Sequence, residues 1–166
     1  MMLKTGEFHE QALAKATASL KIFNLLKYEG KLCVGRNLRE IAAIQSWFQN
    51  HFVKHCTAES RVVFPFLERH VPKLTTSLRV LAMEHTQMKD ALGEIGRCLQ
   101  RIQRNRNGLK SSASVAKLSD LVLYFVYILK NHIRAEDEIV YKTVRHELKN
   151  DELAQLEKRM RVRSLR

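Results

Sequence analysis

His55-Cys-Thr-Ala-Glu59-Ser-Arg-Val-Val-Phe64 recurs later in the chain as His132-Ile-Arg-Ala-Glu136-Asp-Glu-Ile-Val-Tyr141. Both segments have the pattern H-x-x-A-E-x-x-[V/I]-V-[F/Y]. In a helix, residues four positions apart lie one turn apart on the same face, so each His and its Glu can converge on one point. Imidazole nitrogen and carboxylate oxygen together suit iron, zinc or manganese. The doubled pattern therefore predicts a site between two helices that holds two metal ions.

Apolar residues recur every three to four positions around both copies, which predicts long amphipathic helices. The helix that carries the first copy is expected to follow Gly35 and to kink or end at Pro65. The composition of the segment 105–114 predicts a loop. No strand is expected, because the one β-like run, 62–66, contains a proline. The other helices are expected at about 7–28, 74–102, 118–140 and 151–160.

This pattern predicts an all-α fold, an up-and-down four-helix bundle with a short C-terminal fifth helix. The bundle is expected to occupy residues 1–148, and a short helix with a basic tail is expected at 149–166. Each of the four long helices has one histidine within its apolar stripe. A single core histidine needs only a hydrogen-bond partner, but four of them with two glutamates would be costly to bury unpartnered. Two metal ions would satisfy all of these candidate ligands, which are His9, His55, Glu59, His85, His132 and Glu136.

The order H…H-x-x-x-E…H…H-x-x-x-E, from His9 to Glu136, resembles the hemerythrin-like (HHE cation-binding) family. The segments 59–67 and 83–85 also look like the second and third helices of that family, and the likeness extends to about residue 148. The resemblance implies a non-haem centre of two iron ions, with an oxo or hydroxo bridge. It implies that Glu59 and Glu136 bridge the ions, that His9 and His55 serve one ion, and that His85 and His132 serve the other.

Two positions depart from the oxygen-carrying hemerythrins. Those proteins have H-x-x-x-H on the third helix, where this chain has Lys89 four residues after His85. They end with H-x-x-x-x-D, whereas both Glu136 and Asp137 follow His132 here, so either carboxylate could be the ligand. These differences weaken the expectation of reversible O2 carriage.

An additional ligand could come from His51, one turn before His55, or from Tyr141, near the turn of Glu136. The alternatives are that His51 faces solvent and that Tyr141 is a packed aromatic residue. Glu84 is next to His85 but is rotated about 100° away from it on a helix, so we expect it at the surface.

The composition predicts one ordinary globular domain. The chain has 166 residues, of which 45% are hydrophobic, and a formal net charge of +12. The basic residues gather in 97–110 and 158–166. Such a surface can attract nucleic acid or an acidic partner, but no aromatic residue is interleaved with the 97–110 cluster to stack on bases. The plainer interpretation is a solvated helix end and a tail.

The cysteines and the N-terminus favour a reduced, cytoplasmic setting. Three cysteines without a C-x-x-C spacing argue against a disulfide scaffold or a thiolate zinc site. The N-terminal segment has no apolar core of a secretory signal, and no apolar run reaches the roughly 20 residues that cross a bilayer. No membrane partner is expected, and the oligomer could be a monomer or a dimer.

The leading hypothesis is a di-iron protein that binds, senses or detoxifies O2, NO or peroxide. Turnover of peroxide or NO would make it an enzyme, and the sequence leaves that open. One alternative is an iron- or oxygen-responsive regulatory module that acts through a protein partner at the basic tail. Another is a basic helical bundle that binds nucleic acid. The pocket beside the metal ions is expected to be lined by Phe48, Phe52, Phe125 and Ile128.

Overall fold

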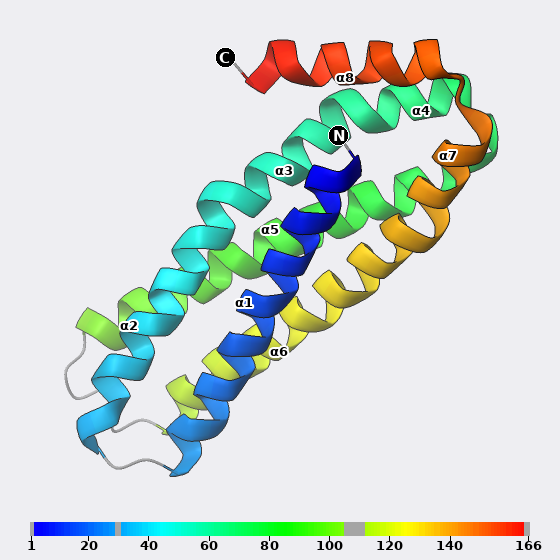
Figure 1. The fold of residues 1–166 in the computed structure, drawn as a ribbon. Coiled ribbons are helices and arrows are strands. Elements are labelled where there is room, and N and C mark those ends of the chain that lie inside the picture. The colour runs from blue at the N-terminus through cyan, green and yellow to red at the C-terminus, as the bar shows by residue number, and fades with distance from the viewer. Residues whose placement is uncertain (1, 29–30, 105–111, 165–166) are drawn as a thin grey trace.

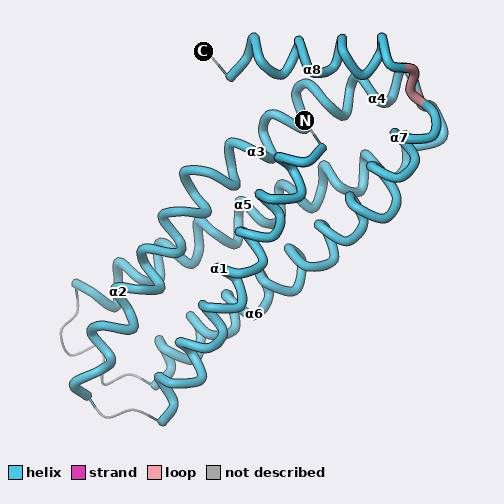
Figure 2. The backbone as a smooth tube through the Cα atoms, in the orientation of Figure 1, coloured by secondary structure: helices cyan, strands magenta, loops and turns pink. Residues whose placement is uncertain are grey.

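The computed structural model describes residues 2–28, 31–104 and 112–164. All of these residues are helical except Val71, Leu148 and Lys149, and none of them forms a strand (Figure 2). The predicted all-α fold is therefore confirmed. The predicted loop at 105–114 lies mostly outside the described residues, and its last three positions already belong to a helix.

Four long helical rods form the bundle, and a fifth helix lies beside the end of the second rod (Figure 1). The first rod is α1 (Met2–Tyr28). The second is continuous and consists of α2 (Lys31–Trp47), the π-helical turn η1 (Phe48–Phe52), α3 (Val53–Ala58), the π-helical turn η2 (Glu59–Val63) and α4 (Phe64–His70). A 3-10 turn, η3 (Pro72–Leu74), leads into the third rod, α5 (Thr75–Arg104). The fourth comprises α6 (Ser112–Ala135), the π-helical turn η5 (Glu136–Tyr141) and α7 (Lys142–Glu147), and α8 (Asn150–Ser164) follows it.

The second rod begins earlier than the sequence predicted, and of the two possibilities at Pro65, a kink or an end, it does not take the end. It begins at Lys31, before Gly35, and it continues through Pro65 to His70. A helix can include Gly35 because glycine costs only about 1 kcal/mol relative to alanine inside a helix. Pro65 lies in the first turn of α4, directly after η2, where the regular i→i−4 hydrogen bonds are already interrupted. Its missing N–H therefore costs less there than in the middle of a regular helix.

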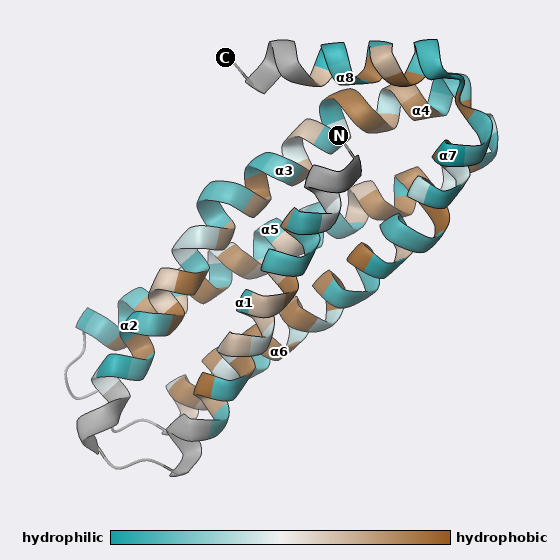
Figure 3. Ribbon diagram, viewed as in Figure 1, coloured by the Kyte–Doolittle hydropathy of each residue, from teal (hydrophilic) through white to brown (hydrophobic). Residues whose placement is uncertain are grey.

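The buried apolar side chains form two clusters, one toward each end of the bundle. The larger cluster includes Phe48, Phe52 and Phe125, and the smaller one includes Phe66 and Leu156. Figure 3 shows the alternating hydrophobic and hydrophilic segments along the rods that are typical of amphipathic helices. Leu156 is 1% exposed, so α8 packs on the bundle through this residue. On the second, third and fourth rods, Glu59, His85 and Glu136 lie between the residues that each rod gives to the two clusters, so these ligands lie at the boundary of the two apolar regions.

No helix in the described part of the chain combines the length and the apolar character that a bilayer span requires.

Candidate metal site

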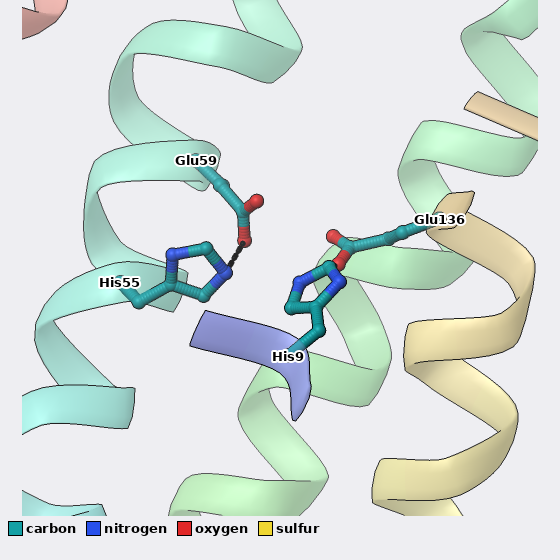
Figure 4. Close-up of side chains that lie close together, drawn as sticks. All are labelled: His9, His55, Glu59 and Glu136. Atoms are coloured by element: carbon teal, nitrogen blue, oxygen red, sulfur yellow. Dashed lines mark ion pairs between the residues drawn. The ribbon is translucent and has the colours of Figure 1, made fainter. Parts of the chain in front are cut away.

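The structure brings the six predicted ligand residues together in the core. They form two groups of four, and within each group one ligand atom per residue lies within 4.8 Å of the others. Glu59 and Glu136 belong to both groups. His9 and His55 complete one group (Figure 4). His85 and His132 complete the other, so each group has two imidazoles and shares both carboxylates.

Local helix geometry explains how these side chains meet. His55 and Glu59 are one turn apart on the second rod, with Nε2 and Oε2 3.3 Å apart. His132 and Glu136 repeat this arrangement on the fourth rod, with Nε2 and Oε1 also 3.3 Å apart. The first rod contributes His9, whose Nε2 lies 3.2 Å from Oε2 of Glu136. The third contributes His85, whose Nε2 lies 3.6 Å from Oε2 of Glu59.

Five atoms of this cluster lack a hydrogen-bond partner, and they are the five such buried side-chain atoms found among the described residues. They are His9 Nε2, His55 Nε2, Glu59 Oε2, Glu136 Oε1 and Glu136 Oε2. A buried polar atom without a partner typically costs about 1–3 kcal/mol. Because every one of these atoms is a lone-pair donor of the kind that binds iron, zinc or manganese, the donor set fits a metal pair.

The outer ring nitrogens of three histidines have partners that fix the ring orientation. His9 Nδ1 lies 3.2 Å from a carboxylate oxygen of Asp137, and His132 Nδ1 lies 2.9 Å from one of Glu84. Ionised carboxylates only accept, so both Nδ1 atoms donate. His85 Nδ1 is hydrogen-bonded to the Ser60 hydroxyl at 2.8 Å. Each Nε2 is thereby directed inward, which is the arrangement that histidine ligands of metals have in proteins.

The Nε2 atom of His85 faces the Nε2 atom of His132. The two atoms are 3.0 Å apart, a distance at which two lone pairs repel unless a proton or a metal ion lies between them. Burial raises the cost of charge at His85, and together with the nearby His132 it lowers the pKa of His85 to about 3. Burial also disfavours charge at His132, but the nearby carboxylates of Glu136 and Glu84 outweigh it and raise its pKa to about 9. By themselves, these side chains therefore favour a proton on His132, in the place where a metal ion would bind.

The pKa values of the two shared glutamates, Glu59 and Glu136, also change in opposite directions. Burial, with the charge of Glu136, raises the pKa of Glu59 well above its usual range. Burial acts against ionisation of Glu136 too, but His132 and His9 outweigh it and lower the pKa of Glu136. Burial lowers the pKa of His55 to about 4, so this imidazole is neutral and its lone pair is free to bind. A metal ion would displace the protons of Glu59 and His132 on binding.

Each shared glutamate is the first residue of a π-helical turn, Glu59 of η2 and Glu136 of η5. Such turns are frequent at functional sites. The aromatic residues at the end of the repeated phrase have different contacts. Phe64 stacks on the ring of His85 with 5.3 Å between centroids, whereas Tyr141 donates a hydrogen bond from its hydroxyl to Oε1 of Glu59 at 2.8 Å. The two halves of the cluster are therefore similar but not equivalent.

The alternatives for an additional ligand have different places in the structure. His51 is exposed, and its Nδ1 lies 3.0 Å from the carbonyl oxygen of Trp47 in its own helix, so it is not part of the cluster. Tyr141 is buried and contacts Glu59. The Asp137 side chain is 48% exposed and contacts the outer side of His9. Asp137 is in neither of the two groups of four.

The expectation that Glu84 lies at the surface was wrong. Its carboxylate is partly buried and accepts the hydrogen bond from His132. A rotation of 100° along α5 directs this side chain away from the cluster centre but toward the neighbouring α6. Ser60 was not singled out in the sequence, because it is next to Glu59 and is likewise rotated away from the ligand face of its helix. The position directly beside a ligand residue is the signal that could have identified both.

Comparison with known proteins agrees with the cluster. Residues 20–144 match the family model of the hemerythrin HHE cation binding domain. The match includes five of the six clustered residues and begins after His9. Neither the search of curated proteins nor that of solved structures found a match.

Proposed function

The chain belongs to the hemerythrin HHE cation binding domain family, and from that premise we propose that it is a non-haem di-iron protein that binds, senses or detoxifies a small oxidant or diatomic molecule, O2, NO or peroxide. The proposed ligands are His9 and His55 for one ion, His85 and His132 for the other, and Glu59 and Glu136 for both. In this proposal residues 1–148 are the metal-binding unit, and α8 with the tail is an addition to it.

The observation that carries this proposal is the set of five buried atoms without hydrogen bonds. A helical bundle that only binds nucleic acid through its basic surface would have no use for them, and they would destabilise it. Two cations would satisfy all five, together with the facing nitrogens of His85 and His132. Nucleic-acid binding therefore remains the weaker alternative.

Iron bound here would supply Lewis acidity and electron transfer to a small ligand. The protein's own residues would hold and shield it. Asp137, Ser60 and Glu84 orient three imidazoles through their Nδ1 atoms. The Tyr141 hydroxyl donates a hydrogen bond to Oε1 of Glu59 and so orients that carboxylate.

Aromatic rings pack against two histidines of the cluster and would limit the access of water. Phe8 lies against His55 with 4.4 Å between ring centroids, and Phe64 stacks on His85. Of the residues expected to line a pocket, Phe48 and Phe125 border a cavity of about 20 Å³ farther along the bundle. That volume is enough for about one water-sized molecule. Phe52 and Ile128 are buried in the same cluster of apolar side chains but do not line this cavity.

The direct test is the metal content per chain together with the ultraviolet–visible spectrum, in air and after anaerobic addition of NO. We expect about two iron ions per chain, with ferric charge-transfer absorption that changes when NO is added. Less than about a tenth of an equivalent of any metal, even after anaerobic iron loading, would refute the proposal. If the iron-loaded protein showed no spectral change with O2, NO or peroxide, the proposed class of ligand would be refuted but the metal site would not.

Glu84→Ala is expected to weaken iron binding about 10- to 100-fold, the usual effect of losing the outer partner of a ligating histidine. The reason is that His132 would lose the carboxylate that orients its ring. Competition with a chelator of known affinity would measure the change. Glu94→Ala is the matched control, because Glu94 is also on α5 but pairs with Arg97 at the surface. Equal affinities in the two variants would exclude an orienting role for Glu84.

A further inference from the structure

Glu136 presents one oxygen to each of the two groups of four. Its Oε2 lies 3.2 Å from Nε2 of His9, which belongs to one group. Its Oε1 lies 3.3 Å from Nε2 of His132, which belongs to the other group. Both oxygens are buried without a hydrogen-bond partner. This carboxylate is therefore placed to bind two ions through two different atoms.

Glu59 presents the same oxygen to both groups. Its Oε2 lies 3.3 Å from Nε2 of His55 (Figure 4) and 3.6 Å from Nε2 of His85. These two histidines also belong to different groups. Oε2 is buried without a hydrogen bond, whereas Oε1 accepts one from the Tyr141 hydroxyl at 2.8 Å. The two oxygens of Glu59 are therefore not equivalent.

The hydrogen bond from Tyr141 is held in place by the fold. The tyrosine is buried, and it is the last residue of the π-helical turn η5, which begins with Glu136. A hydrogen bond to an ionised carboxylate is roughly twice as strong as one between neutral groups, and a buried donor that lost it would remain unsatisfied. The bond draws electron density from Oε1 of Glu59. Oε2 therefore becomes the better ligand for a cation.

The repeated phrase explains why only one of the two glutamates has this partner. Tyr141 is the fifth residue after Glu136, and Phe64 is the fifth residue after Glu59. Phenylalanine has no hydroxyl to donate, and its ring stacks on His85 instead. One hydroxyl group, present in the second copy of the phrase and absent from the first, therefore distinguishes the two carboxylates.

We propose that Glu136 binds the metal pair through both oxygens, one to each ion, and that Glu59 binds both ions through Oε2 alone. Tyr141 is the positioning residue that withholds Oε1 of Glu59 from the metal. This inference rests on the metal pair of the proposed function. Loss of the Tyr141 hydroxyl would free Oε1 and make the two carboxylates alike.

The test is the crystal structure of the full chain loaded with Zn²⁺, for the natural protein and for Tyr141→Phe. The donor set suits zinc as well as iron, and each ion would have two imidazoles and two carboxylate oxygens, the four ligands that zinc prefers. Zinc has no redox chemistry, so the result is independent of O2, NO and peroxide. Tyr127→Phe is the matched control, because Tyr127 is exposed on α6.

In the natural protein we expect Oε2 of Glu59 at about 2.0–2.2 Å from both zinc ions, the usual bond length, and Oε1 bonded to neither. Tyr141→Phe should keep both ions but lose this difference, with Oε1 now bonded to one of them. Tyr127→Phe should be identical to the natural protein.

Two results would overturn the inference and leave the metal pair intact. One is a natural protein in which each oxygen of Glu59 binds a different ion. The other is a Tyr141→Phe protein whose Glu59 still binds through Oε2 alone. A cluster that takes up no zinc and no iron would overturn the metal pair as well. If Tyr141→Phe fails to fold, the structure of the natural protein by itself confirms or refutes the binding mode of Glu59.

Discussion

Replacing Glu136 with glutamine is expected to lower the iron content from about two ions per chain to well below one. Glu136 belongs to both groups of four, and both of its carboxylate oxygens are buried without a hydrogen bond. Glutamine has nearly the same shape but no negative charge, and its NH2 group cannot bind a cation. Loss of this one charge therefore weakens both halves of the cluster together. Iron would be measured per chain after anaerobic loading and removal of unbound metal.

Glu138→Gln is the matched control. Glu138 is in the same π-helical turn, but it is exposed and pairs with Arg134 at the surface. This variant should keep its full iron content. His132→Ala, in contrast, should lose mainly one ion, because His132 belongs to only one of the two groups. A Glu136→Gln protein with normal iron content would contradict the proposal that this residue is shared by two ions.

Removing the metal is expected to lower the melting temperature by on the order of 10 °C or more. A ligand that binds only the folded chain at about 1,000 times its dissociation constant stabilises it by about 4 kcal/mol per site. In a protein of this size, each kcal/mol changes the melting temperature by roughly 2–4 °C. The effect should be large here because chelation leaves five buried polar atoms without partners. Calorimetry with and without a chelator would measure it.

The Glu136→Gln variant provides the control for that experiment as well. A chelator should change its melting temperature little, since it should hold little iron. A chelator effect of equal size in both proteins would mean that the stabilising ion binds elsewhere. No effect in the natural chain, at full iron occupancy, would mean that the folded and unfolded chains bind iron equally well.

The helical pattern and the repeated phrase were enough to predict the fold and the convergence of six residues. Spacing along one helix determines that His55 and Glu59 share a face, and the apolar stripe determines that this face is buried. The burial of His9 followed from its stripe alone, although it has no repeated motif around it. These predictions depend only on the spacing of residues along one helix, and that spacing can be read from the sequence.

The contacts between helices could not be predicted in the same way. Glu84 reaches His132 because of the way α5 and α6 are rotated about their axes relative to each other. The spacing of residues along one helix does not determine this relative rotation. The passage of the second rod through Pro65 depends on the π-helical turn before it, which the sequence pattern does not reveal. The packing of α8 on the bundle depends on Leu156, which is one leucine among several in the sequence.

The contribution of α1 to the cluster has a topological consequence. The residues that meet there include His9 of α1 and Glu136 of η5, which lie near opposite ends of the bundle's chain. Metal ions bound by both ends of this span would act as a cross-link that closes most of the polypeptide into one loop, and closing a long loop restricts the unfolded chain. The first rod could then not separate from the fourth without breaking a coordination bond. Fraying of the N-terminal helix and loss of the metal would become one event, so the lifetime of the bound iron would be governed by the docking of α1.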